Sequence, residues 1–516
     1  MNSVIRSALF LVLSLPLLLS PGVALVRDLR DPALAGPGVP QRSINLHRDL
    51  TPRIERWARD RIASGRAAHT ELHDVPTNEW PMFTSVFYLL GTRELEAAWQ
   101  RGELGDAPEP LSYARGAIDA ARDLVIDPVH HTWVRTHWGD DYFHRQDVFF
   151  RALVISALTN HMALTHDASD EPLLRDQVET LAAELDDSPL GLLNDYPYEC
   201  YPIDVLVAVA WIREADAVLG TDHSAFVERE LRAFTGAQAD ALGLVRYRVD
   251  LSNDHEHAYD VQPGRGTGMS WVLVFAPELW PVQARDWYTR YARSFWQDHG
   301  WAAGFREYAP GTESENGFEI DAGPVLDGFG TASSAFGIAA ARRNGRFDQA
   351  YALETEMSAV SWTLPDGTLL LPRVVSHAAD APYLGEAALQ YVISVQPAAG
   401  VAIVPATGGP SGLVYFGLAV YLGIPLLAAL QLVLAVRRVL TERAAARKLG
   451  ACSSNEDNTR PSGAPSEAPP ISTTTSTTTT EGGSADSPAT SAFARSSATG
   501  SSASRAPSTD TAPSAR

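Results

Sequence analysis

The chain has 516 residues, of which 45% are hydrophobic and 20% are charged, so it can bury a full core and is long enough for more than one domain. Its formal net charge of −21 at pH 7 lacks the basic footprint that nucleic-acid binding needs, so we expect no nucleic-acid partner. The two cysteines belong to no Cys-x-x-Cys or Cys/His cluster, and the sequence gives no support for a metal site.

The first predicted element is an apolar run at residues 8–19. It follows Arg6 and precedes Gly22, Val23 and Ala24, which is the order of a secretory signal with a basic start, a short apolar run and small residues at a cut site. An anchor that is not cleaved is the competing interpretation. Residues 1–26 are therefore predicted to be a signal peptide or a signal anchor.

The main predicted domain covers residues 45–398 and is all-α. Apolar residues recur at helical spacing between loops that are rich in Gly, Pro, Asp and Trp. Segments of this kind lie at 148–158, 205–217, 270–275 and 331–342. A series of helix pairs of this length can close into an α/α toroid, here an (α/α)6 barrel, around a central cavity. Only residues 363–375, around the Pro-Asp-Gly sequence, are typical of a β-hairpin.

Chemically reactive side chains concentrate in the loops before the predicted helices. Glu79 precedes an apolar segment that ends near Tyr88, and His137 opens a His-Trp-Gly-Asp-Asp sequence before the next one. In a toroid every second helix start opens on the same face, so these loops would line one mouth. His255 and His257 lie in a similar loop without a third ligand nearby, and we interpret them as solvated loop residues.

Cys200 lies in residues 195–204, where a thiol, three tyrosines, three carboxylates and two prolines are crowded together. Such neighbours can shift the pKa of a thiol, donate hydrogen bonds or move protons, as a catalytic site requires. The alternative is a structural cysteine at a helix start. Prolines and carboxylates are favoured in a first turn, and the residues that follow are plainly helical and apolar.

Two carboxylates have both a catalytic and a structural interpretation. Glu79 is next to Trp80, whose ring could desolvate the carboxylate and raise its pKa towards general-acid duty, but Glu79 could also cap a helix after Thr77. Asp204 follows Cys200 by four residues, so both would lie on one helix face and could cooperate. As an acid in a first turn, Asp204 would otherwise interact with the helix dipole.

Glu307 is the most interesting member of an acidic region near residues 307–327. Trp301, Phe305 and Tyr308 surround it in the sequence, and Arg306 could pair with it or bind an anionic group. Paired carboxylates flanked by Trp and Tyr are also what a glycoside hydrolase needs, because aromatic faces stack on sugars. Hydrolysis of a glycan is therefore an alternative function, although it gives Cys200 no task.

The last apolar segment, residues 413–436, has no charge and is long enough to cross the ~30 Å hydrocarbon layer as a helix. Five basic residues follow it closely, so the positive-inside rule predicts a cytoplasmic C-terminus and an extracytoplasmic main domain. Cys452 would then lie across the membrane from Cys200. Residues 450–516 are rich in Ser, Thr, Pro and Ala, and we expect a disordered tail.

The sequence resembles the linalool dehydratase/isomerase family at residues 78–88, 198–200, 305–308 and 330–333. This resemblance spans roughly residues 50–395. It implies an (α/α)6 barrel around an apolar cavity, located outside the cytoplasm. It also implies dehydration or isomerisation of a tertiary allylic alcohol without an organic cofactor or a metal. Cysteine, tyrosine, histidine and carboxylate side chains are the groups used by that family.

The resemblance is partial at the level of single residues. Tyr88 matches the tyrosine at the end of the family's first motif, and Cys200 is similar to one of two active-site cysteines. Met82 stands where the family has an acid/base aspartate, and Leu153 or a near neighbour stands in place of its histidine. The chain thus departs from the family's pattern at these two positions, and one fold can host several chemistries.

The sequence thus predicts a membrane-anchored lyase or isomerase that needs no cofactor and acts on an unsaturated, terpenoid-like alcohol or a similar lipophilic small molecule. The alternatives are a glycoside hydrolase and an inactive membrane-tethered scaffold, and a homo-oligomer is compatible with each. The predicted catalytic residues are Tyr88, Cys200, Glu79, Tyr198 and Glu307. The predicted substrate-binding residues are Trp80, Phe83, Asp204, His137 and Tyr308.

Overall fold

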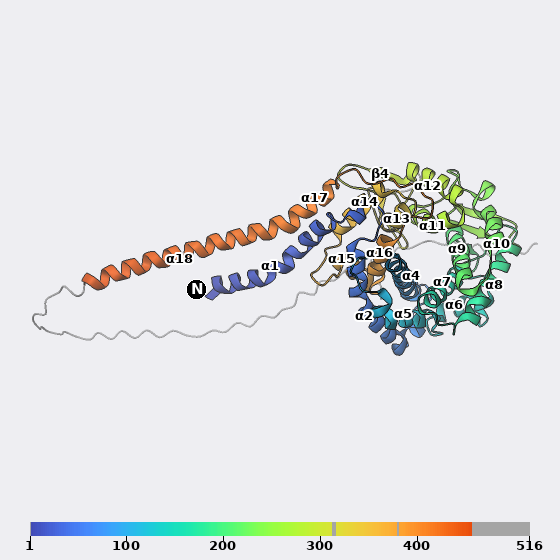
Figure 1. Ribbon diagram of the computed structural model, residues 1–516, viewed down its shortest axis with the longest axis horizontal. Coiled ribbons are helices and arrows are strands. Elements are labelled where there is room, and N and C mark those ends of the chain that lie inside the picture. The colour runs from blue at the N-terminus through green and yellow to red at the C-terminus, as the bar shows by residue number, and fades with distance from the viewer. Residues whose placement is uncertain (1, 312–315, 379–380, 457–516) are drawn as a thin grey trace, which may run out of the picture. The chain divides into compact units, whose positions relative to one another are not determined.

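The computed structural model describes residues 2–311, 316–378 and 381–456 (Figure 1), with side chains described from residue 13, and at Phe10, to residue 448. It is mostly helical with a few short strands, which confirms the all-α prediction. The chain divides into two compact units, Met1–Arg443 and Ala444–Arg516, and the described part of the second is the end of one helix. The predicted disordered tail lies, beyond residue 456, outside the described residues.

One set of helices is apolar on nearly every face and is buried. It consists of α4 (Trp80–Gln100), α7 (Val148–Thr165), α9 (Pro202–Leu219), α11 (Gly266–Leu279), α13 (Thr331–Arg343) and α16 (Leu384–Ser394). Each of them contacts the next one in this order, and α16 contacts α4. Helices that are hydrophobic all round belong in a core. The four helical segments predicted from periodicity lie in α7, α9, α11 and α13 and are confirmed.

A second set of helices packs against the first. It consists of α2 (Gln41–Ser64), α5 (Pro110–Ile126), α8 (Glu171–Asp187), α10 (Ser224–Glu230), α12 (Pro281–Phe295) and α14 (Phe347–Val360). The sequence of α2 explains this position, because Leu46, Leu50, Ile54 and Trp57 form one buried stripe and the arginines between them reach solvent. Short helices connect the larger ones: α3 (Val75–Asn78), α6 (Thr132–Trp138) and α15 (Leu370–Ala378).

The strands lie in the loops that precede buried helices. β1 (Glu199–Cys200) pairs antiparallel with β2 (Arg248–Leu251), which pairs with β3 (Ala258–Gln262). β4 (Trp296–Asp298) pairs with β5 (Ala303–Phe305). β6 (Gly317–Glu319), β7 (Gly323–Leu326) and β8 (Phe329–Gly330) form the third sheet. These loops bring the strand residues next to the starts of α9, α11 and α13.

The predicted hairpin at residues 363–375 forms only around its turn. A single bridge joins Thr363 to Leu369, and the chain then continues as α15. Pro372 explains the difference, because a proline cannot donate to a strand ladder but is tolerated in the first turn of a helix.

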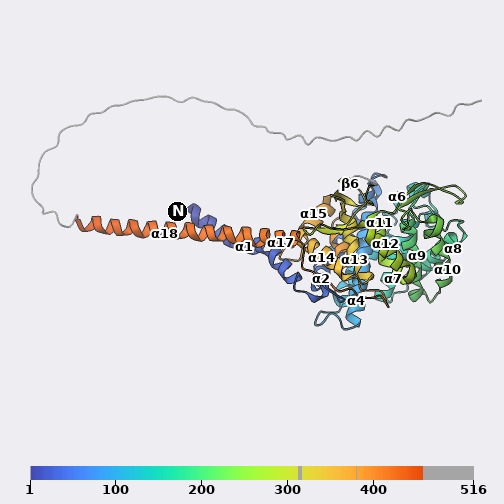
Figure 2. The same ribbon diagram turned by 90° about the horizontal axis from the view of Figure 1, so that it is seen from above.

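The two ends of the first unit meet each other. α1 (Asn2–Asp28) contacts α14, α17 (Gly412–Leu418) and the π-helical segment η6 (Ala419–Gly423), beside which it runs in both views (Figures 1 and 2). α18 (Ile424–Glu456) continues directly from η6. Over residues 412–448 this continuous helix has a mean hydropathy of 2.2 in its most apolar window, and only 11% of that window is buried. It contains the apolar run predicted at residues 413–436.

Candidate active site

Several carboxylates at the starts of the buried helices bind backbone N–H groups. Asp195 accepts from the N–H of Phe149 at 2.9 Å in α7 and from that of Tyr201 at 2.6 Å, just before α9. Glu307 accepts from the N–H and the hydroxyl of Thr267 at 3.1 and 2.7 Å in the first turn of α11. Unpaired N–H groups at a helix start favour such partners, so these two carboxylates are helix caps.

Glu79 is buried immediately before α4, but its side chain does not cap that helix. Its Oε1 instead accepts a hydrogen bond of 2.6 Å from the hydroxyl of Tyr196. Burial raises the pKa of Glu79 to about 8, against the lowering effect of that hydrogen bond and with the help of the nearby charges of Asp321, Asp147 and Asp204. The carboxyl group is thus protonated over much of the neutral range, as the general-acid interpretation requires.

Asp204 lies in the first turn of α9 and is half-buried. No side chain or backbone group among the described residues forms a hydrogen bond with its carboxyl group. Burial, followed by the charge of Asp321, raises the pKa of Asp204 to about 8. A first-turn acid that merely stabilised the helix would be ionised, whereas this one is a protonated acid at neutral pH.

The Asp204 side chain lines a small void between the buried helices. The other lining residues are Phe83 of α4, Phe149, Ala152 and Leu153 of α7, Val207 and Trp211 of α9, and Trp271 of α11. Asp204, Val207 and Trp211 are spaced i, i+3 and i+7, so one face of α9 lines about 10 Å of the void. The volume of about 10 Å³ is that of one water molecule.

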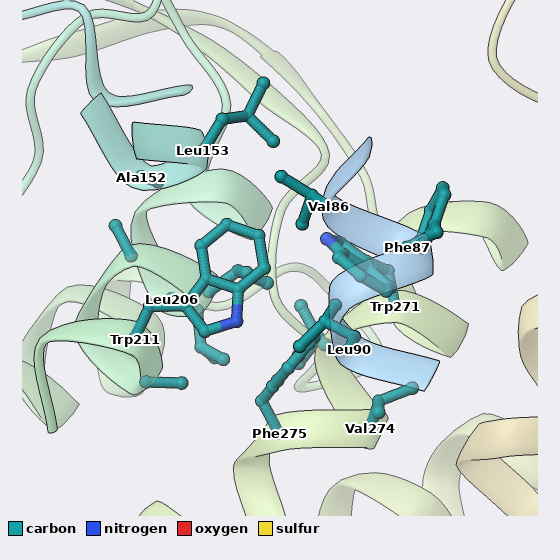
Figure 3. Close-up of a cluster of buried hydrophobic side chains, with 14 of the residues drawn as sticks. Val86, Phe87, Leu90, Ala152, Leu153, Leu206, Trp211, Trp271, Val274 and Phe275 are labelled. Carbon is teal, nitrogen blue, oxygen red and sulfur yellow. The ribbon is translucent and has the colours of Figure 1, made fainter. Parts of the chain in front are cut away.

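Aromatic rings fill the space beside the void (Figure 3). The rings of Trp271 and Phe275 lie edge to face with centroids 4.8 Å apart, and Phe87 approaches Trp271 at 5.7 Å. The indole N–H of Trp211 is buried and has no hydrogen-bond partner among the described residues. The candidate site therefore combines an apolar aromatic wall, one unused N–H donor and protonated carboxyl groups.

Cys200 is fully buried in β1, opposite Val249. Burial raises its pKa well above the ordinary value, and the charges of Asp195 and Asp204 raise it further. The side chain is therefore a neutral thiol and a poor nucleophile. It is not among the residues that line the void described above.

The two predicted catalytic tyrosines lie away from the Glu79 and Asp204 carboxyls. Tyr88 faces α2, where its hydroxyl is 2.9 Å from the hydroxyl of Thr51 and its ring stacks on His47 at 5.1 Å. Tyr198 is 70% exposed at the tip of a turn, with a left-handed φ of 76°. Neither side chain lines the void.

Some of the predicted substrate-binding residues line the void and others do not. Phe83 lines the void, whereas Trp80 is half-buried at the start of α4. His137 packs edge to face on Tyr196 at 6.0 Å and lines a separate open depression of about 390 Å³. Tyr308 donates to Glu319 at 3.1 Å, and the Arg265 guanidinium lies over its ring at 5.2 Å, so it does not line the void.

Sequence reasoning missed three residues of the site. Tyr196 lies in the same crowded segment as Cys200, so the sequence could have indicated it as a hydrogen-bond donor of the site. Trp211 follows Asp204 at i+7, which places both on one helix face and is a signal visible in the sequence. Trp271 has no comparable signal, because its position against Phe83 results from the packing of α4 and α11.

No group of three or more potential metal ligands occurs among the residues that the structure describes. His255 is buried with its Nε2 3.2 Å from the amide nitrogen of Gln146, and His257 is exposed. In comparisons with known proteins, the chain matches no protein-family model and no curated protein.

Proposed function

We propose that the main domain is an (α/α)6 barrel. The closed series of contacts through α4, α7, α9, α11, α13 and α16 supports this proposal, since an inner ring requires each helix to touch two neighbours. The packing of α5 on α4, α8 on α7, α12 on α11 and α14 on α13 supplies the matching outer helices. In such a barrel the inner helices start at one end. Glu79 precedes α4, Asp204 lies in the first turn of α9, and Glu307 binds the first turn of α11, so all three would lie at that end.

The proposed activity is that of a cofactor-independent lyase or isomerase acting on a small unsaturated alcohol or a similar lipophilic molecule. The observation that supports it most is Asp204, a protonated carboxyl group without a hydrogen-bond partner among the described residues, at the edge of an aromatic void. The likeness to linalool dehydratase/isomerase motifs points to the same chemistry. A fold can host many reactions, so the site carries more weight than the likeness.

The reaction begins when one carboxyl group donates its proton to the hydroxyl oxygen of the substrate. The C–O bond breaks, the electron pair leaves with water, and an allylic cation remains beside the rings of Phe83 and Trp271. The carboxylate left by this transfer then removes a proton from the neighbouring carbon and a diene forms, or water returns at another carbon and an isomer forms. Burial raises the pKa of both Glu79 and Asp204 to about 8, so each group can hold the proton that the first step needs.

Substrate entry requires two rings to move. Phe83 and Phe149 are half-buried and lie 5.3 Å apart, and they are the members of the lining that reach solvent beside Asp204. Because the void holds only one water molecule, rotation of these rings must make the remaining space. A short-chain alcohol needs less of this movement than a long terpenoid.

The test is product formation from short-chain and terpenoid tertiary allylic alcohols, measured by gas chromatography with the purified membrane protein. Asp204→Asn should lower the rate about 10²–10⁴-fold, because an amide cannot donate a proton in this way. The wild-type rate should fall as the pH rises through about 8. Asp140→Asn is the matched control, since Asp140 is fully exposed in a neighbouring loop. Equal activity of both variants would remove Asp204 from the mechanism.

A non-catalytic, membrane-tethered scaffold is the second candidate function. The observation that favours it is the filled interior, since known ligand pockets are typically ~300–1,000 Å³. Under that function no alcohol is converted and none changes the melting temperature. The glycoside hydrolase alternative loses its main acid, because Glu307 is engaged as the cap of α11.

We also propose an extracytoplasmic location for the main domain. The apolar helix over residues 412–448 is the proposed membrane span, and the basic residues from Arg437 onward support a cytoplasmic end for it.

A further inference from the structure

The predicted signal sequence forms one continuous helix that is built into the fold. α1 has 27 residues and passes without interruption through Gly22, Val23 and Ala24, where the cut site was expected. One face of its last turns is buried, with Leu25 only 1% exposed. A segment destined for removal would not be required for packing of the mature protein.

Gly22 lies against the C-terminal helix at very close range. A Cβ atom at this position would be 2.5 Å from the Leu422 side chain and 3.1 Å from Cβ of Tyr421. Small residues at such contacts let two helices approach closely, as they do in pairs of membrane helices. Any larger residue at position 22 requires Leu422 to move.

The contact continues towards the main domain. Leu25 packs with Val414, Tyr421 and Ala359 in a separate hydrophobic cluster. The Tyr421 hydroxyl donates a hydrogen bond of 2.6 Å to the carbonyl of Ala359 in α14. The π-helical turn of η6 contains Tyr421, and such turns often mark positions where a helix adapts to a specific contact.

A buried ion pair fixes the end of α1 to the domain. Asp28 is 4% exposed and accepts from Arg42 at 2.9 Å, and Arg42 also donates to the hydroxyl of Thr363 at 3.0 Å. A buried ion pair requires both partners, because an unpaired charge in the interior costs several kcal/mol. The direction of α1 as it leaves the domain is therefore determined by the core.

Away from these contacts, both helices expose large apolar side chains. On α1 they include Phe10 at 73% and Leu13 at 71%, and on α17 and α18 they include Phe416 at 65% and Ile424 at 62%. Large apolar surfaces that are exposed on two neighbouring helices are typical of helices in contact with the hydrocarbon of a membrane. Residues 8–26 would span about 28 Å as a helix, close to the ~30 Å thickness of a bilayer core.

We propose that α1 is retained in the mature protein as a second membrane-spanning helix, paired with α17 and α18 through Gly22. This inference adds to the proposed membrane location and is independent of the proposed chemistry. Arg437 follows the apolar part of α18, so the positive-inside rule places the far end of α18 in the cytoplasm. Because α1 contacts α17 and η6 at its domain end, the far end of α1 would lie on the same side as that of α18.

The first test uses the full chain with one epitope tag at each end, expressed in a bacterial host. Intact-mass measurement of the membrane protein should give the uncut chain with both tags, resistant to extraction with alkaline carbonate. Loss of the N-terminal tag together with the mass of residues 1–24 would overturn the proposal. So would an uncut chain that carbonate releases from the membrane.

The second test measures the helix pairing itself. In a Cys452→Ser background with a protease site in the exposed loop at Asn253, Gly22→Cys combined with Leu422→Cys should form a disulfide on mild oxidation. The two proteolytic fragments should then stay joined until they are reduced. Gly36→Cys combined with Leu422→Cys is the matched control, because no atom lies within 4 Å of a Cβ at Gly36. Equal cross-linking in the two pairs, or none in either, would contradict the close contact at Gly22.

Discussion

Carboxylates near the starts of the buried helices differ in the groups that donate hydrogen bonds to them. Asp195 and Glu307 receive backbone N–H groups of helix starts, whereas Asp204 receives none among the described residues and Glu79 receives one tyrosine hydroxyl. Accepted N–H bonds favour the ionised form of a carboxylate, but burial outweighs them here and raises the pKa of all four groups. The helix caps therefore differ from the candidate acids in their hydrogen-bond partners and not in the direction of their pKa shifts.

The raised pKa values make stability depend on pH. The folded protein keeps the protons of Glu79 and Asp204 up to about pH 8, whereas the unfolded chain loses them near the ordinary values of 4.5 and 3.8. Folding thus binds protons between these limits. The contribution of these two groups to the free energy of unfolding is greatest below about pH 4 and should fall as the pH rises towards 8. Thermal unfolding over this range measures the effect.

Glu79→Gln provides the check on that prediction. The amide oxygen can still accept the hydrogen bond from Tyr196, but the group no longer titrates, so the fall in melting temperature with pH should become shallower. The exposed Asp140→Asn should leave the slope unchanged. A slope identical to that of the wild type in Glu79→Gln would show that Glu79 is already ionised at neutral pH.

Cys200 should be unreactive in the folded protein. Because the thiol is fully buried and its pKa is raised, iodoacetamide should leave it unmodified at pH 8 in the native state and modify it completely in denaturant. Mass spectrometry of the peptide that contains residues 195–204 distinguishes the two results. Rapid native labelling would require an open path to the thiol and would support the nucleophilic role suggested by the sequence.

At the scale of elements, the start of α11 depends on a residue from a distant loop. Glu307 follows the whole of α11 and α12 in the chain but binds Thr267 and Ser333, and so connects the starts of α11 and α13. Glu307→Ala should lower the free energy of unfolding by about 2–4 kcal/mol, because several buried donors lose their acceptor. Urea denaturation measures this loss.

Glu103→Ala is the control for that substitution, because Glu103 forms only a surface ion pair with Arg101 and should change stability by less than about 1 kcal/mol. If Glu307 were instead a catalytic acid, Glu307→Ala would abolish turnover at full stability. The two measurements together decide between the cap and the glycoside hydrolase acid.

The elements were easier to predict than the site. Helical spacing identified α7, α9, α11 and α13 because buried helices are long and strongly apolar, and the first-turn position of Asp204 followed from the same pattern. The direction of the Tyr88 side chain could not be predicted, since α4 is buried on several faces around this residue. The sequence does not show that Tyr88 meets Thr51 of α2 while Phe87 meets Trp271. Likewise, only the paired backbone shows that Cys200 is enclosed by β2.

At the scale of the whole molecule, orientation across the membrane can be tested with one reporter. Asn253→Cys lies in an exposed loop of the main domain, and the native thiol at Cys200 is buried. A membrane-impermeant maleimide applied to intact cells should therefore label Asn253→Cys and leave Cys452 unlabelled. Labelling of Cys452 alone would reverse the proposed orientation and place the main domain in the cytoplasm.

The contact between the two ends of the main unit sets a constraint on biosynthesis. Arg42 and Thr363, which share a hydrogen bond, are 321 residues apart. At translation rates of ~5–20 residues per second, roughly 15–65 s pass between the appearance of the two residues. Throughout this interval Arg42 and the apolar face of α1 are already synthesised, but Thr363 and the segments α17 and η6 that contact α1 are not. The domain can complete its fold only near the end of translation, so an early stop codon should yield a chain prone to degradation.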